Sequence, residues 1–259
     1  SREVPESERD YFLEEKYRMK YVTQLLFLLI ILSVFLTSCS ANYEQEYQFN
    51  DTFDEDQQGW VAGFADLPAD YDPAQFMLDS GWGSLPSGLE GNALFLSGNN
   101  HSDDLFMFIQ KQFTGLKPET TYQVQFDVEL ASNSPAGMMG IGGSPGESVY
   151  IKAGAVNHEP EIIPDSINWL RMDIDKGNQA GEGADMINLG TFSNPNIDAE
   201  TQVGDEYALM RLDNQYVPFQ ATSDKDGNIW VVIGSDSGFE GKTAVYYNSI
   251  NITLTEENQ

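Results

Sequence analysis

Alternating apolar and polar side chains predict β-strands along most of the chain after residue 49. In the clearest case, 122–130, every second residue is apolar: Val124, Phe126, Val128 and Leu130. This period of two is typical of a strand with one buried and one solvated face. We also expect strands at 49–54, 92–97, 105–109, 168–174, 229–233 and 244–254.

The segment 105–109, with the sequence LFMFI, is apolar at every position. Such a run indicates a central strand that is covered on both faces. Turns rich in Gly, Pro and Asn separate the predicted strands, and no stretch has a persuasive amphipathic helical pattern. We therefore predict an all-β fold: one domain, 49–255, forming a two-sheet jelly-roll-like β-sandwich with long Gly/Pro-rich loops.

The N-terminal region has a different pattern. An apolar run at 25–36 follows Lys20. Its last residue, Leu36, begins the sequence Leu-Thr-Ser-Cys, which ends at Cys39. A basic start, a short apolar core and small residues before a cut site are the layout of an export signal. The last four residues resemble a bacterial lipobox, whose cysteine is lipidated. The alternative, an uncleaved membrane helix, would need about 20 apolar residues.

We accordingly predict a signal peptide at 19–38, followed by lipidated Cys39 and a polar tether at 39–48. Residues 1–18 are polar and acidic, and we interpret them as a disordered, over-extended gene start. Cys39 is the only cysteine, so the chain has no internal disulfide, and lipidation accounts for the single thiol. The predicted location is extracytoplasmic, lipid-anchored in the cell envelope, at the bacterial outer membrane or cell surface.

Charge narrows the choice of partners. The chain has 13 Lys and Arg against 41 Asp and Glu. Residues 1–38 contain 5 basic and 6 acidic residues. Residues 39–259 therefore contain 8 basic and 35 acidic residues, which gives them a net charge of −27. A surface this acidic repels phosphates and anionic lipids, which excludes nucleic-acid binding and leaves the lipid anchor as the membrane contact. The share of hydrophobic residues, 41%, is large enough for a sizeable core. We expect the protein to be a monomer.

Three phrases resemble jelly-roll carbohydrate-binding modules and galactose-binding-like domains. They are Gly59-Trp60, GLKPETTYQVQFDVEL at 115–130 and YYNSINITL at 246–254. The resemblance implies a β-sandwich whose partner is a glycan or another cell-surface ligand. It also implies a structural Ca²⁺ as the possible cofactor, with Asp54 and Asn248 as its candidate ligands, although Asn248 stands where these families usually have Asp.

Sugar binding requires a flat aromatic face with hydrogen-bonding side chains at its rim. If 168–174 is a strand, Trp169, Arg171 and Asp173 share one face, and the apolar residues between them share the other. Trp82, between two glycines in a loop-like stretch, is a second candidate. The alternative is that a loop or the second sheet covers Trp169. We expect the remaining tryptophans in the core: Trp60 and Trp230.

The sequence thus predicts a surface-anchored lipoprotein with a non-catalytic glycan-binding or surface-interaction domain. One alternative is a polysaccharide lyase or glycoside hydrolase that uses paired carboxylates, such as Glu147 with Asp173 or Asp175. Another is a structural envelope protein. Converging carboxylates in a cleft would favour hydrolysis, and an aromatic strip without them would favour binding.

Overall fold

The computed structural model describes residues 18–20, 45–101, 104–200 and 205–257. The chain divides into two units, Ser1–Tyr43 and Glu44–Gln259. In the first unit only a helical turn at 18–20 is described, so the apolar run, Cys39 and most of the tether lie outside the described residues. Within the described part, no helix is both long and apolar enough to span a membrane.

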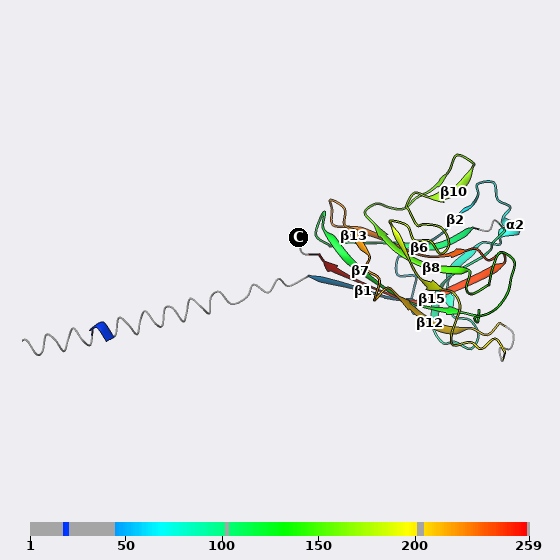
Figure 1. Ribbon diagram of the computed structural model, residues 1–259, viewed down its shortest axis with the longest axis horizontal. Helices are drawn as coiled ribbons and strands as arrows, with labels where there is room; N and C mark the ends of the chain where they lie inside the picture. The colour runs from blue at the N-terminus through cyan, green and yellow to red at the C-terminus, as the bar shows by residue number, and fades with distance from the viewer. Residues whose placement is uncertain (1–17, 21–44, 102–103, 201–204, 258–259) are drawn as a thin grey trace, which may run out of the picture. The chain divides into compact units, whose positions relative to one another are not determined.

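The second unit is almost entirely β-structure (Figure 1), with one short helix, α2 (Pro73–Phe76). A seven-stranded sheet contains β1 (Glu46–Thr52), β4 (Asp79–Ser84), β5 (Asn92–Asn99), β7 (Thr121–Ser132), β12 (Ala208–Asp213), β13 (Gln220–Thr222) and β15 (Lys242–Glu256). A five-stranded sheet contains β2 (Val61–Ala65), β6 (Leu105–Phe113), β8 (Val149–Val156), β11 (Met186–Thr191) and β14 (Ile229–Ser237). A three-stranded sheet contains β3 (Leu67–Pro68), β9 (Ile162–Pro164) and β10 (Trp169–Met172).

The two large sheets form the predicted sandwich. Their strand orders are β12-β7-β15-β5-β4, with β1 on β15 and β13 on β7, and β11-β8-β14-β6-β2. The pairs within them are antiparallel, and the chain passes repeatedly from one sheet to the other, as from β5 to β6 to β7 to β8. The all-β, jelly-roll-like sandwich with long loops is therefore confirmed.

The main core lies between these sheets, and β7 illustrates how the sequence builds it. Its even-numbered residues from Tyr122 to Leu130 are buried, while the odd-numbered residues between them are exposed or half-buried. On the opposing sheet, Val231 and Ile233 of β14 enter the same core. Period-two patterning therefore sets which side chains meet between the sheets.

Strand β6 is buried on both faces, as its apolar sequence predicts. Leu105, Met107 and Ile109 enter the main core. Phe106 and Phe108 point the other way, into a second hydrophobic cluster with Met172 of β10 and other residues. This cluster is covered by the three-stranded sheet and the loop 173–185, which together we call the outer layer.

The loop-like stretch around Trp82 is more ordered than its sequence indicates, since residues 65–91 contain β3, α2 and β4. Asp72 caps α2 by accepting a hydrogen bond from the backbone N–H of Ala74 at 2.9 Å. Strand β4 is an edge strand in which Gly81 lies against Phe95, whose ring would be 3.0 Å from an added Cβ. The glycines that suggested a loop instead allow this close approach.

The alternation in β7 generates a stability prediction. Phe126 is 1% exposed and its ring lies 5.6 Å from that of Phe219. Phe126→Ala is expected to lower the free energy of unfolding by roughly 3–5 kcal/mol, because it leaves a cavity. Gln125→Ala, on the solvated face, is the matched control and should change it by less than about 0.5 kcal/mol. Denaturant unfolding measures both, and equal effects would contradict the assignment of faces.

Candidate binding site

A cavity opens where the outer layer meets the loops beside β2 and β6. Its volume is about 310 Å³, at the lower end of the roughly 300–1,000 Å³ typical of ligand pockets. Its lining is mainly polar and charged: Asp66, Asp104, Arg171, Met172, Ile174, Asp175, Lys176, Gly177 and Asn178.

The cavity lies at the opposite end of β6 from the start of the domain. Asp104, in the cavity wall, directly precedes β6. At the other end of that strand, the Phe113 ring lies 4.6 Å from the ring of Phe49, in the middle of β1. Figure 1 likewise shows β1 and β10 toward different ends of the sandwich. The cavity is therefore remote from the point where the tether joins the domain.

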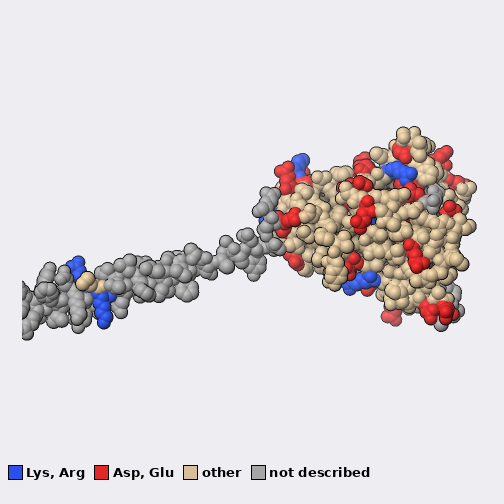
Figure 2. All heavy atoms as spheres, viewed as in Figure 1, with Lys and Arg blue, Asp and Glu red and all other residues tan. Residues whose placement is uncertain are grey.

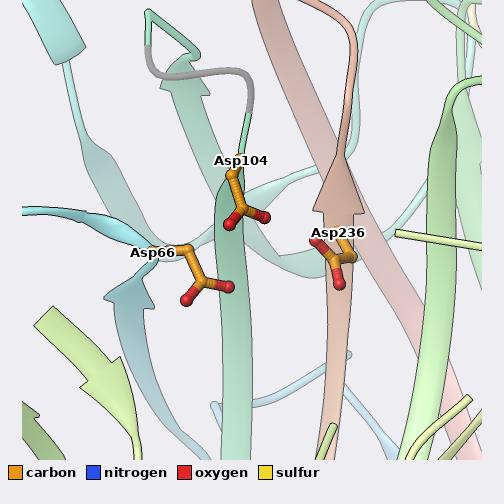
Figure 3. A group of neighbouring side chains, drawn as sticks. All are labelled: Asp66, Asp104 and Asp236. Carbon is orange, nitrogen blue, oxygen red and sulfur yellow. The ribbon is translucent and has the colours of Figure 1, made fainter. Parts of the chain in front are cut away.

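Three aspartates from distant parts of the sequence converge beside this cavity (Figure 3). Asp66 lies between β2 and β3, Asp104 precedes β6, and Asp236 is near the end of β14. One carboxylate oxygen of each lies within 4.8 Å of those of the other two. Asp66 and Asp236 are buried, whereas the Asp104 side chain is 19% exposed.

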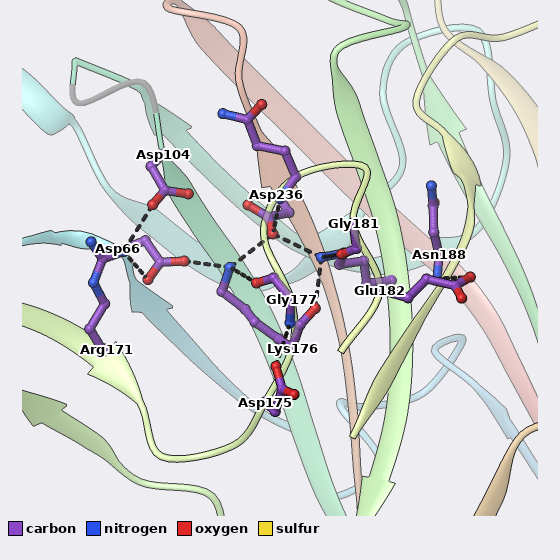
Figure 4. Close-up of polar contacts among 12 residues, drawn as sticks. Asp66, Asp104, Arg171, Asp175, Lys176, Gly177, Gly181, Glu182, Asn188 and Asp236 are labelled. Carbon is purple, nitrogen blue, oxygen red and sulfur yellow. Dashed lines mark hydrogen bonds and ion pairs between the residues drawn. The ribbon is translucent and has the colours of Figure 1, made fainter. Parts of the chain in front are cut away.

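Three cations neutralise these carboxylates (Figure 4). Arg171 Nη1 donates to Asp66 Oδ1 at 2.6 Å and to Asp104 Oδ2 at 2.9 Å. Lys176 Nζ lies 2.6 Å from Asp66 Oδ2 and 2.8 Å from Asp236 Oδ2. Lys152 Nζ lies 3.2 Å from Asp236 Oδ2. With every group ionised the cluster sums to zero charge, and buried charges need such pairing.

Burial and nearby charges shift the pKa values of Asp104, Lys176 and Lys152 in different directions. Burial, helped by the negative charge of Asp66, raises the pKa of Asp104 above its ordinary value. Burial would lower the pKa of Lys176, but Asp236 and Asp66 outweigh it and raise that pKa. For Lys152, burial dominates over the attraction of Asp236 and lowers the pKa.

The three aspartates do not fit a divalent cation in this arrangement. They are the one set of three or more acidic, His or Cys side chains in the described part of the chain whose ligand atoms converge. However, the Lys176 ammonium already lies between Asp66 and Asp236. A divalent ion there would face a fixed positive charge at contact distance, so we treat the cluster as a polar wall of the cavity.

The predicted strand at 168–174 exists as β10, and its parity is as expected. Met172 and Ile174 are buried in the second cluster. On the other face, Trp169 is half-buried and its ring centroid lies 5.1 Å from Arg171 Cζ, a cation–π distance. Arg171 lines the cavity, whereas Asp173 does not. Asp173 is exposed and accepts a hydrogen bond from the backbone N–H of Glu161 at 2.8 Å.

The other tryptophans lie elsewhere. Trp82 is 41% exposed on edge strand β4 of the seven-stranded sheet, and its Nε1 donates to the Phe53 carbonyl at 2.6 Å. It therefore does not share a strand platform with Trp169, which belongs to the outer layer. Trp60 is buried in the main core, as predicted. Trp230 is half-buried against the second cluster, because it has outward parity on β14.

The candidate calcium ligands, Asp54 and Asn248, come from neighbouring segments. Phe53, which precedes Asp54, donates its backbone N–H to the Asn248 carbonyl at 3.4 Å. Asn248 lies at a bulge in β15, and its Nδ2 donates to Glu129 Oε2 at 2.6 Å. Among the residues described, Asp54 belongs to no converging set of three acidic, His or Cys side chains. A calcium site here stays a prediction.

The carboxylates considered for catalysis are not gathered in one cavity. Glu147 lies beside a different cavity, of about 390 Å³, and accepts a hydrogen bond from Gly137 N–H. Asp175 lines the charged cavity, where its carboxylate accepts backbone hydrogen bonds from Gly177 and Ala184. Asp173 lines neither cavity. If a carboxylate pair acts here, it is Asp66 with Asp104.

Apart from Arg171, sequence reasoning missed the charged residues of the cluster. One usable signal was present, since Lys152 and Asp236 are lone charges within otherwise buried strands, β8 and β14. A charge in such a strand must find a partner. Asp66, Asp104 and Lys176 carry no comparable pattern, because they sit in connecting segments.

No protein-family model matches the chain, and no curated protein matches it. Solved structures do resemble it, among them a carbohydrate-binding module, TmCBM27, analysed for specific mannan recognition: identity is 11%, TM-score 0.39, covering 83% of this chain and 99% of the module. A putative sugar-binding protein from Bacteroides thetaiotaomicron has 10% identity and TM-score 0.35, covering 77% of this chain and 88% of that one.

The enzymatically active domain of tailspike protein 4 from bacteriophage CBA120 has 10% identity and TM-score 0.32. That similarity covers 74% of this chain but 19% of the tailspike chain, so this chain spans about a fifth of its length. Carbohydrate-binding modules are thus among the structures similar to this chain, as the sequence resemblance predicts. At these TM-scores the similarities assign neither a ligand nor a site to it.

The raised pKa of Asp104 predicts a pH dependence of stability. A carboxyl whose pKa is higher in the folded state stabilises the fold fully below its unfolded pKa, about 3.9, and loses that contribution as pH rises through the folded pKa. Asp104→Asn removes this loss and retains an oxygen for Arg171. The variant should therefore be more stable than the native chain at pH 7, with the advantage vanishing below about pH 4. Denaturant midpoints between these pH values measure it, and a pH-independent difference would contradict the assignment.

Proposed function

We propose that this domain is a non-catalytic glycan-binding module, displayed outside the cell by a lipid on Cys39, and that its binding site is the cavity beside Arg171. One observation carries the proposal: an open cavity with a mainly polar and charged lining, which places hydrogen-bond donors and acceptors side by side.

The cavity wall suits the chemistry of sugar hydroxyls. A hydroxyl both donates and accepts a hydrogen bond, so it needs acceptors and donors side by side. Asp104 and Asp175 line it with acceptor oxygens, while Arg171 and Asn178 line it with donors. The half-buried Trp169 beneath Arg171 supplies an aromatic edge to the same region.

A polysaccharide-active enzyme is the second candidate, and the pair Asp66 and Asp104 favours it. Glycoside hydrolases combine a carboxylic acid of raised pKa with an ionised carboxylate. Asp104 has a raised pKa, and Asp66 is held by Arg171 and Lys176 in the same cavity wall. Against catalysis, Asp66 is 2% exposed and both of its oxygens face cations.

Glycan binding is tested with the purified full chain on a glycan array, followed by calorimetry with the best ligand. Arg171→Ala should weaken binding at least tenfold, equivalent to about 1.4 kcal/mol, because it removes a donor and uncovers Trp169. Trp169→Ala should weaken it similarly. Tyr216→Ala is the control, since that aromatic side chain is 87% exposed in the loop between β12 and β13.

Three outcomes of this experiment separate the candidate functions. Unchanged affinity in both Arg171→Ala and Trp169→Ala, with the fold intact, would place any glycan site elsewhere. Release of new reducing ends from a polysaccharide, lost in Asp104→Asn, would favour the enzyme. Absence of both binding and cleavage across the array would leave the structural envelope role.

The anchor is tested separately. Cys39→Ser should abolish incorporation of an acyl-chain probe and shift the protein from the membrane to the soluble fraction, because the chain has no other thiol on which the thioether could form. Metabolic labelling and fractionation measure the two effects. Labelling that persists in the variant would refute the lipoprotein assignment.

A further inference from the structure

Lys152 and Asp236 form an ion pair wholly excluded from solvent. Nζ lies 3.2 Å from Oδ2, and both side chains are 0% exposed. The residues are on neighbouring strands, β8 and β14, where Gly234 lies opposite Lys152 in the register. Asp236 lies two pairs further along β14, on the same face of the sheet as Gly234, and because Gly234 has no side chain, none from that position separates the amine from the carboxylate. An amine and a carboxyl are thus held in contact without water.

An ion pair that is excluded from water is costly to bury. Desolvation of two charges is repaid only when geometry and hydrogen bonding are nearly ideal. Here Asp236 Oδ2 accepts from Lys152, Lys176 and the backbone N–H of Gln179, while Oδ1 is buried and has no hydrogen-bond partner in the described part of the chain. A neutral amide in place of the pair would remove two of the buried charges.

We propose that Lys152 and Asp236 become joined by an intramolecular isopeptide bond. The neutral amine of Lys152 attacks Cγ of Asp236 as a proton from a neighbouring carboxyl group reaches one Asp236 oxygen, so that a C–N bond forms and one C–O bond breaks. The displaced hydroxyl takes the proton lost by the nitrogen and leaves as water. Atoms and electrons balance without any oxidant, reductant or cofactor.

Asp104 is placed to carry the proton. One of its carboxylate oxygens lies within 4.8 Å of one of Asp236, and Figure 3 shows the two carboxylates facing each other. Asp104 Oδ1, like Asp236 Oδ1, is buried without a hydrogen-bond partner among the residues described. Burial raises the pKa of Asp104 and lowers that of Lys152, which favours an acid and a free amine together.

The surroundings also offer partners for the product. The single amide N–H of the linked Lys152 would donate to one of the carbonyls of Lys176 and Gly181, which now accept from Nζ at 2.7 and 2.8 Å. The remaining Asp236 oxygen would accept from Lys176 Nζ and Gln179 N–H, now 2.8 and 3.0 Å from Oδ2. Lys176 keeps its charge, since Asp66 also contacts it.

The bond would give this domain an internal covalent cross-link. The chain has one cysteine, so no internal disulfide exists. A Lys152–Asp236 link joins β8 to β14, two central strands of the five-stranded sheet. Resistance to unfolding and proteolysis is a plain advantage for a domain that we propose to be displayed outside the cell.

Peptide mapping of the purified full chain tests the linkage. After denaturation and digestion, mass spectrometry should find the peptides containing Lys152 and Asp236 joined and lighter by one water than their sum. Lys152→Met, which keeps the length of the side chain, should yield linear peptides. Lys111 and Asp51 serve as an internal comparison: their Nζ and Oδ2 are closer, at 2.6 Å, but the side chains are 20% and 11% exposed, and they should stay unlinked.

Two results would overturn the proposal. One is recovery of linear peptides with unmodified Lys152 and Asp236 after prolonged incubation of the folded native chain. The other is a link at Lys176 or at Lys111 in place of Lys152. The role of Asp104 has its own readout in freshly synthesised chain: Asp104→Asn should slow the appearance of the linked peptide, and an unchanged rate would exclude Asp104 as the proton carrier.

Discussion

Two reciprocal lysine contacts hold the outer layer against the five-stranded sheet. Lys152 projects from β8 and donates to the main-chain carbonyls of Lys176 and Gly181 in the loop. Lys176 projects from that loop and reaches Asp236 on β14. Removing either lysine side chain would leave a buried acceptor or carboxylate without compensation, which is far more costly than losing a surface ion pair. The second hydrophobic cluster and the cavity wall both depend on these two lysine contacts, because the contacts hold the outer layer in place.

The outer layer also explains why β6 is apolar on both faces. A sandwich sheet normally presents one face to its partner sheet and the other to water. Here Phe106 and Phe108 are on the outward face, where β10 and the loop after it cover them. The outer layer covers only part of this face, and the cavity opens at the edge of the layer. The need to bury Phe106 and Phe108 thus determines where the polar cavity lies.

The cavity differs from the rest of the domain in its electrostatics. Figure 2 shows acidic side chains spread over the visible face of the domain, with few basic ones. Of the 8 Lys and Arg residues in 39–259, three belong to the cluster beside the cavity: Lys152, Arg171 and Lys176. The domain repels anions at long range but offers balanced donors and acceptors at this one place.

Local pattern in the sequence determined the strands and their buried faces, since a period of two reports which side of a strand meets a core. It therefore predicted β7, β6, the sandwich and the shared face of Trp169 and Arg171. Only the tertiary structure decided which residues surround the cavity. Asp66, Asp104, Lys176 and Asp236 are far apart in the chain, and their pairing depends on how the outer layer docks. Charge pairing acts through space, and a single sequence carries no periodic signal for it.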